Sequence, residues 1–175
     1  MIRELIIDTE TTGLNVKVDR IIELAAIELI DGKRTGNDFH CYFNPWPVKV
    51  SRGAFLIHDI SNYFLRDKPR FGGSAKQFLE LVKGHTLIAH NAKFDSQIIS
   101  FELQRCGEPS ILNENWCDTL KLAKKMYPGR SNSLTNLCKR LKITVGNGPH
   151  GALRDCELLI EAYEAMLTEI RRNIL

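Results

Sequence analysis

The strongest constraint on the fold of this chain is a short apolar run close to its start. Leu5, Ile6 and Ile7 are followed directly by Asp8. An unbroken apolar run of this length is typical of a central strand that is covered on both faces. The sequence therefore predicts a buried strand whose carboxyl end opens onto a site and carries Asp8.

The rest of the chain predicts further strands and then helices. Further strands are expected at Ile21 to Ile30, Asn37 to Phe43, Thr86 to Ala89 and Asn115 to Asp118, with a hairpin turn at Asp31-Gly32. Helical spacing is found at Ser74 to Lys83, Phe94 to Leu103, Thr119 to Met126 and Ser133 to Leu141, and from Ala152 onward. Ser74 and Ser133 are placed to cap their helices. This order predicts an α/β fold, with a five-stranded mixed sheet flanked by helices.

Length and composition fit one soluble domain. The 175 residues suit a single domain spanning 1–175, and the stretch that contains Pro45, Pro47 and Pro69 is expected to be irregular. No apolar run approaches the roughly 20 residues that a membrane span needs. Five scattered cysteines without a CxxC pair are typical of reduced thiols, so we expect a cytoplasmic protein without membrane contact. The formal net charge of +3 permits a polyanionic partner without requiring one.

The first acidic cluster lies at the end of the first strand. Asp8 and Glu10 are two residues apart, so their side chains leave the same face with Cα atoms about 6.5 Å apart. A divalent ion fits between them, although an isolated Asp-x-Glu is more often a solvated loop start. Thr11, Thr12 and Gly13 follow and offer hydroxyls and an accessible backbone for a nucleotide; alternatively, Gly13 only makes a turn.

A second cluster follows the strand that ends at Ala89. Asn91, Phe94 and Asp95 occupy the passage from that strand into a helix, so another carboxylate comes at the carboxyl end of a strand. Taken singly, Asn91 is better explained as a helix N-cap and Phe94 as a core residue. The shared position with Asp8 is what favours a functional interpretation.

The third cluster begins the last helix. Asp155 adjoins the apolar stripe made by Cys156, Leu159 and the later residues of that helix, so it faces the protein body. A buried carboxylate needs a compensating charge, and a divalent ion shared with Asp8 and Glu10 supplies it. His150 precedes Asp155 by five residues, a separation that puts it in the loop before the helix, where a neutral imidazole can act as a general base.

Together the three clusters resemble the DEDD exonucleases of the histidine subtype. Their signature is Asp-x-Glu, then an Asn-x-x-Phe-Asp-like motif, then His-x-x-x-x-Asp, and all five signature positions occur here in order. Further similarity, to the proofreading subunits of bacterial DNA polymerase III, lies in residues 8–14, 57–60, 128–134, 137–138 and 150–152. One departure is Cys156, where the family commonly has alanine.

The resemblance implies a ribonuclease H-like exonuclease fold and two Mg²⁺ or Mn²⁺ ions. It assigns Asp8, Glu10, Asp95 and Asp155 to the metals and His150 to the activation of the attacking water. It places six residues near the terminal nucleotide: Thr11, Thr12, Gly13, His58, Asn91 and Phe94.

The activity that the resemblance implies is 3′-to-5′ hydrolysis of single-stranded or mismatched DNA ends, as proofreading in replication, with the polymerase III alpha subunit as partner. The alternative is a free-standing exonuclease that acts on RNA or repair intermediates, and a non-catalytic binding module is a further alternative. Proofreading subunits generally continue into a clamp-binding motif and a polymerase-binding tail, whereas this sequence stops at Leu175. We therefore expect that tail to be absent, which leaves two possibilities: an excised domain or a protein that works differently.

Overall fold

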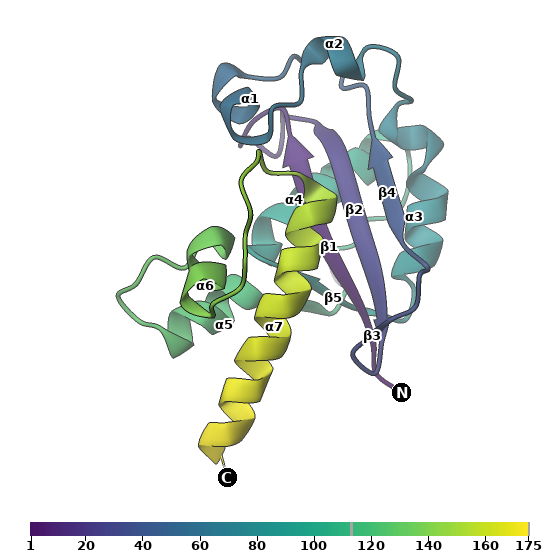
Figure 1. Ribbon diagram of the computed structural model, residues 1–175. Helices are drawn as coiled ribbons and strands as arrows, with labels where there is room; N and C mark the ends of the chain where they lie inside the picture. The colour runs from purple at the N-terminus through teal and green to yellow at the C-terminus, as the bar shows by residue number, and fades with distance from the viewer. Residues whose placement is uncertain (113, 175) are drawn as a thin grey trace.

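The computed structural model describes residues 1–112 and 114–174, which form one mixed sheet covered by helices on both faces (Figure 1). The strands are β1 (Arg3–Thr11), β2 (Ile21–Ile30), β3 (Lys33–Arg34), β4 (Phe39–Tyr42), β5 (Thr86–Ala89) and β6 (Trp116–Asp118). Their order is β3-β2-β1-β5-β6, and β4 pairs with β2 beside β3. The predicted α/β fold and its five strands are confirmed, and the two-residue β3 is an addition.

β1 lies at the centre of the sheet because both of its faces are apolar. It pairs antiparallel with β2 and parallel with β5. Leu5 and Ile7 join the core beneath one layer of helices, and Ile6 joins the core beneath the other. In this register Asp8 is opposite Ala25 and Glu10 is opposite Glu23, which places two carboxylates side by side on neighbouring strands.

Helices cover the sheet in two layers. The helices are α1 (Arg52–His58), α2 (Asn62–Leu65), α3 (Ala75–Val82), α4 (Ala92–Arg105), α5 (Thr119–Met126), α6 (Leu134–Arg140) and α7 (Ala152–Ile174). Apolar side chains of α3 and α4 fill the core on one face, and those of α6 and α7 fill it on the other. None of the described helices has the length and apolarity that crossing a membrane would need.

The stretch after β4 was wrongly expected to be irregular throughout. It contains α1, α2 and a 3-10 turn at Phe71–Gly73. Ser51 and Ser61 cap the two short helices, each through a side-chain oxygen that accepts a backbone N–H three residues later. Helices this short show little apolar periodicity, so their caps are the main sequence signal for them.

The predicted caps and turn had mixed outcomes. Ser133 caps α6 by accepting the backbone N–H of Asn136, as expected. Ser74 occupies the N-cap position of α3, but its side chain makes no capping hydrogen bond. Asp31 and Gly32 both have positive φ, of 49° and 75°, as the hairpin turn between β2 and β3 requires.

Candidate active site

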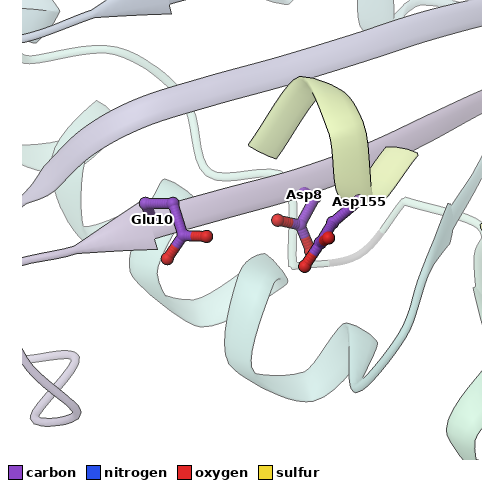
Figure 2. A group of neighbouring side chains, drawn as sticks. All are labelled: Asp8, Glu10 and Asp155. Atoms are coloured by element: carbon purple, nitrogen blue, oxygen red, sulfur yellow. The ribbon is translucent and has the colours of Figure 1, made fainter. Parts of the chain in front are cut away.

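Three carboxylates meet where β1 ends and α7 begins. Asp8 and Glu10 lie on one face of β1, and Asp155 lies in the first turn of α7 (Figure 2). One oxygen from each of the three carboxylates lies within 4.8 Å of the others. The sequence prediction that these residues converge is therefore consistent with the structure, and the alternative of a solvated loop start for Asp8 and Glu10 does not match their place inside a strand.

The cluster is electrostatically strained when it holds only protein atoms. Burial raises the pKa of Asp8 well above its ordinary value, and the neighbouring carboxylates raise it further. Burial and the charges of Asp155 and Glu23 raise the pKa of Glu10 to about 8. Like charges that are held this close favour either protonation or a bound cation.

A divalent metal ion fits this donor set. Within residues 1–112 and 114–174, no lysine or arginine forms an ion pair with Asp8, Glu10 or Asp155. Carboxylate oxygens are hard ligands of the kind that Mg²⁺ and Mn²⁺ prefer. The described side chains therefore do not supply the positive charge that would balance these three carboxylates.

Asp95 approaches the cluster from a different element. It lies in the first turn of α4, is 4% exposed, and accepts a hydrogen bond of 2.8 Å from the Thr9 hydroxyl. Burial raises the pKa of Asp95 to about 7, although the Thr9 hydroxyl opposes the shift. Its charge also raises the pKa of Asp8, so the fourth predicted carboxylate lies within electrostatic reach of the others.

His150 lies in the loop before α7, as its separation from Asp155 predicts. Its Nδ1 is 2.7 Å from Oδ2 of Asp155, and its side chain is 42% exposed. The backbone N–H of His150 donates to the carbonyl of Ile57, which ties this loop to α1. With Nδ1–H donating to the carboxylate, the neutral ring keeps the Nε2 lone pair free to accept a proton.

A hollow of about 550 Å³ adjoins Glu10. Its lining includes Thr11, Gly13 and Leu14 from the end of β1 and His58 from α1. The imidazole of His58 is 3% exposed, and its Nδ1 accepts the backbone N–H of Ile60, so Nε2 carries the ring proton. Burial lowers the pKa of His58, and Nε2 has no hydrogen-bond partner within the described residues. A ligand oxygen in the hollow would satisfy this donor.

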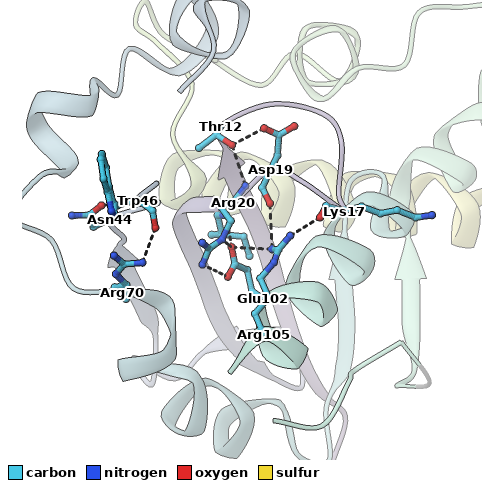
Figure 3. Close-up of polar contacts among 10 residues, drawn as sticks. Thr12, Lys17, Asp19, Arg20, Asn44, Trp46, Arg70, Glu102 and Arg105 are labelled. Carbon is cyan, nitrogen blue, oxygen red and sulfur yellow. Dashed lines mark hydrogen bonds and ion pairs between the residues drawn. The ribbon is translucent and has the colours of Figure 1, made fainter. Parts of the chain in front are cut away.

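The loop after β1 is braced by its own residues and by side chains of α4 (Figure 3). Thr12 is fully buried, and its hydroxyl donates to Asp19. This hydroxyl therefore stabilises the loop and does not face the hollow. A Cβ on Gly13 would lie 2.7 Å from an oxygen of Asp19, so any other residue there would displace the carboxylate that Thr12 bonds. Arg20, at the end of the loop, forms an ion pair with the buried Glu102 of α4. Its Nη2 donates to Oε2 of Glu102 at 2.9 Å.

The remaining two predicted substrate residues flank the start of α4. Asn91 is exposed and occupies the N-cap position of α4, but its backbone is left-handed, with φ of 86°, and its side chain makes no capping hydrogen bond. Phe94 is half-buried and packs against the core. Neither residue lines the hollow beside Glu10.

Glu23 is a site residue that the sequence analysis missed. It is 1% exposed on β2, opposite Glu10. Its carboxylate accepts the backbone N–H of Ala152 and lies 2.8 Å from Nε2 of His40. Glu23 therefore holds the N-terminus of α7, and with it Asp155, against the sheet.

Known proteins match nearly the whole chain. The model of the RNase T family, described as exonuclease, matches residues 5–163. The DNA polymerase III subunit epsilon of Rickettsia typhi is 45% identical over 170 residues, which span 94% of this chain and 74% of that protein. The Escherichia coli epsilon subunit is 38% identical over 173 residues, with 94% and 71% covered.

Solved structures agree with this family. A structure of exonuclease X in complex with 5′ overhanging duplex DNA is 32% identical, with a TM-score of 0.69, covering 96% of this chain and 92% of that one. The zinc-bound E. coli exonuclease I complex with single-stranded DNA has a TM-score of 0.86 at 23% identity, and covers 98% of this chain and 42% of that one. The second likeness concerns the fold alone. The chain belongs to the RNase T exonuclease family, together with the DNA polymerase III epsilon subunits.

Proposed function

We propose that this chain is a 3′-to-5′ exonuclease that removes nucleotides from single-stranded or mismatched DNA 3′ ends, as a proofreading subunit of DNA polymerase III. The observation that carries the proposal is the uncompensated group of Asp8, Glu10 and Asp155 beside the hollow that contains His58. The likeness to DNA polymerase III epsilon subunits supports a role in replication. We further propose that the chain acts in the cytoplasm with the polymerase alpha subunit as partner.

Each side chain has a distinct role in this proposal. Asp8, Glu10 and Asp155, with Asp95 beside them, would hold the divalent ions. Two Mg²⁺ or Mn²⁺ ions would supply charge stabilisation to the attacked phosphate and to both the attacking and leaving oxygens. His150 accepts the proton of the attacking water at Nε2, because Asp155 fixes Nδ1 as the donor.

The hollow positions the terminal nucleotide. Leu14 is 86% exposed and Ile57 is 56% exposed, and both line it, so they offer apolar surface to a base or sugar. The Nε2–H of His58 donates to an oxygen of the nucleotide, and the Thr11 and Gly13 backbone lies beside the same space. In this proposal Thr12 acts through the loop, while Asn91 and Phe94 contact the nucleotide from the start of α4.

The test is digestion of single-stranded DNA that carries different labels at its two ends. We expect the 3′-labelled mononucleotide to be released first, with Mg²⁺ or Mn²⁺ required and a chelator abolishing release. RNA of the same sequence and matched or mismatched primer ends provide the comparisons. A strong preference for RNA would favour the free-standing RNA exonuclease, and release from the 5′ end would refute the proposed polarity.

A further inference from the structure

The positive charge of the chain is concentrated in one segment. Residues 119–150 contain seven lysines and arginines and no acidic residue. Removing these seven from the chain's 24 leaves 17 basic residues against 21 acidic ones, a net charge of −4 for the remainder. The segment forms α5, α6 and the loops around them, seen in green beside α7 in Figure 1.

Six of these side chains make what we term the α5–α6 surface, and all six are exposed. They are Lys121, Lys124, Lys125, Arg130, Lys139 and Lys142. None of them forms an ion pair with any residue of the described ranges. The seventh cation, Arg140, instead bonds to Asn132 and Ser131 and lies over the Tyr127 ring.

The segment that carries the α5–α6 surface contacts the chain just before α4, next to Asn91. His90, beside Asn91, lies 3.0 Å from the hydroxyl of Thr119 and donates from Nε2 to the carbonyl of Asn132 at 2.7 Å. Lys121 also lines a hollow of about 430 Å³ together with Lys93 of α4, although Asp118 and Glu114 share that hollow. The same segment ends at His150, so it connects two of the three site clusters.

We propose that the α5–α6 surface binds the phosphate backbone of the DNA single strand that leads into the active site. This inference rests on the proposed function. A protein partner usually requires an apolar centre in its interface, and none of the large exposed apolar side chains of the described residues lies within 119–150. The one aromatic ring there, Tyr127, already contacts Arg140, so the surface offers charge without stacking. Binding is therefore independent of sequence and sensitive to salt.

The test measures affinity and hydrolysis separately. The double variant Lys124→Glu/Lys125→Glu is compared with Lys33→Glu/Lys76→Glu, which makes the same charge change at exposed lysines of β3 and α3. Fluorescence anisotropy with a labelled single-stranded oligonucleotide, in chelator, reports binding without hydrolysis. Turnover of the p-nitrophenyl ester of thymidine 5′-monophosphate reports the active site without a leading strand.

We expect the Lys124→Glu/Lys125→Glu variant to raise the Kd for the oligonucleotide about tenfold at low salt. The slope of log affinity against log salt concentration should become shallower by about 1.4, which corresponds to the loss of two phosphate contacts on a single strand. The control variant should change the Kd much less, and both should hydrolyse the ester normally. Equal weakening by both variants, or by neither, overturns the proposal. Tighter binding of duplex than of single strand would assign the surface to duplex instead.

The neutral variant Lys124→Gln/Lys125→Gln guards against misfolding of α5, because it removes charge without placing acids at a helix C-terminus. The glutamine variant should raise the Kd for the oligonucleotide by a factor between those of the control and the glutamate variant. If the glutamate variant is unfolded and the glutamine variant binds with an unchanged Kd, the proposed role of the α5–α6 surface is wrong. If no protein hydrolyses ester or DNA while the affinity differences persist, the proposed function fails and the binding surface stands.

Discussion

The two ends of the sheet treat buried carboxylates in opposite ways. At the carboxyl end of β1, burial and mutual repulsion raise the pKa of Asp8 and Glu10. At the other end, Glu28 of β2 is 4% exposed and is surrounded by donors. It accepts hydrogen bonds from Thr35 and Arg3 and pairs with His85, and these partners lower its pKa to about 2.

The difference shows which carboxylates serve the fold and which serve chemistry. Glu28 has protein partners for its charge. So has Glu102, whose two carboxylate oxygens accept hydrogen bonds from Nε and Nη2 of Arg20. Asp8 and Glu10 have no such partner among the described side chains, so the fold gains nothing from their charges unless a cation binds. Stability and activity should therefore respond oppositely when carboxylates are neutralised at the two ends.

The largest expected effect is on activity at the carboxyl end. Asp8→Asn removes the charge of the carboxylate at the centre of the acidic group, and with it a proposed metal ligand. We therefore expect the rate of hydrolysis to fall by about a thousandfold or more. The metal-free variant should be at least as stable as the parent, because repulsion is relieved. Single-turnover digestion and urea unfolding in chelator measure the two quantities.

Glu28→Gln is the matched control, since it neutralises a buried carboxylate at the other end of the same sheet. It should retain activity within about twofold, as it lies at the opposite end from the hollow. If Asp8→Asn kept its activity, or if it destabilised the metal-free protein more than Glu28→Gln does, the contrast between the two ends would be wrong.

An intermediate effect concerns the pH dependence of the metal-free protein. Glu10 has a folded pKa of about 8, above its ordinary 4.5, so near pH 7 the folded state binds more protons than the unfolded state. Stability must then fall as pH rises through that window, by about 1–2 kcal/mol between pH 7 and 9. The imidazoles of His58 and His90 contribute little above pH 7, because their folded pKa values are lowered and their ordinary value of 6.5 lies below this window.

Thermal unfolding at several pH values, with chelator or with Mg²⁺, measures this effect. The Tm in chelator should decline between pH 7 and 9, and the rise in Tm caused by Mg²⁺ should grow over the same range, because the ion competes with protons for the carboxylates. A Tm in chelator that stays level or increases would show that the carboxylates of the cluster, Glu10 among them, are already ionised at pH 7.

Short-range patterns predicted much of the fold and the site. The apolar run before Asp8, its alternation with Glu10, and the stripe beside Asp155 are local signals that the structure reproduces. The place of His150 in a loop followed from helical geometry alone. α5 even has the predicted bounds, Thr119–Met126.

What escaped prediction depends on partners that are far apart in the sequence. Glu23 sits inside an apolar strand, and its function as an anchor comes from Ala152, 129 residues away. The burial of Thr12 depends on how the loop folds back to bring Asp19 to its hydroxyl. The pattern of a single strand or loop does not contain such pairings, which arise only when the elements pack.

The smallest expected effect is on stability at the Glu28 end. Glu28→Gln leaves a shape that fits the site but cannot carry the charge that Thr35, His85 and Arg3 favour, so we expect a loss of about 2 kcal/mol at neutral pH. The folded pKa of about 2 is below the ordinary 4.5, so this contribution is complete above pH 4.5 and is lost as pH falls toward 2. Urea unfolding of both proteins between pH 3 and 7 should therefore give curves that converge on acidification. A difference that persisted undiminished at pH 3 would mean that packing around Glu28, and not its charge, stabilises this end of the sheet.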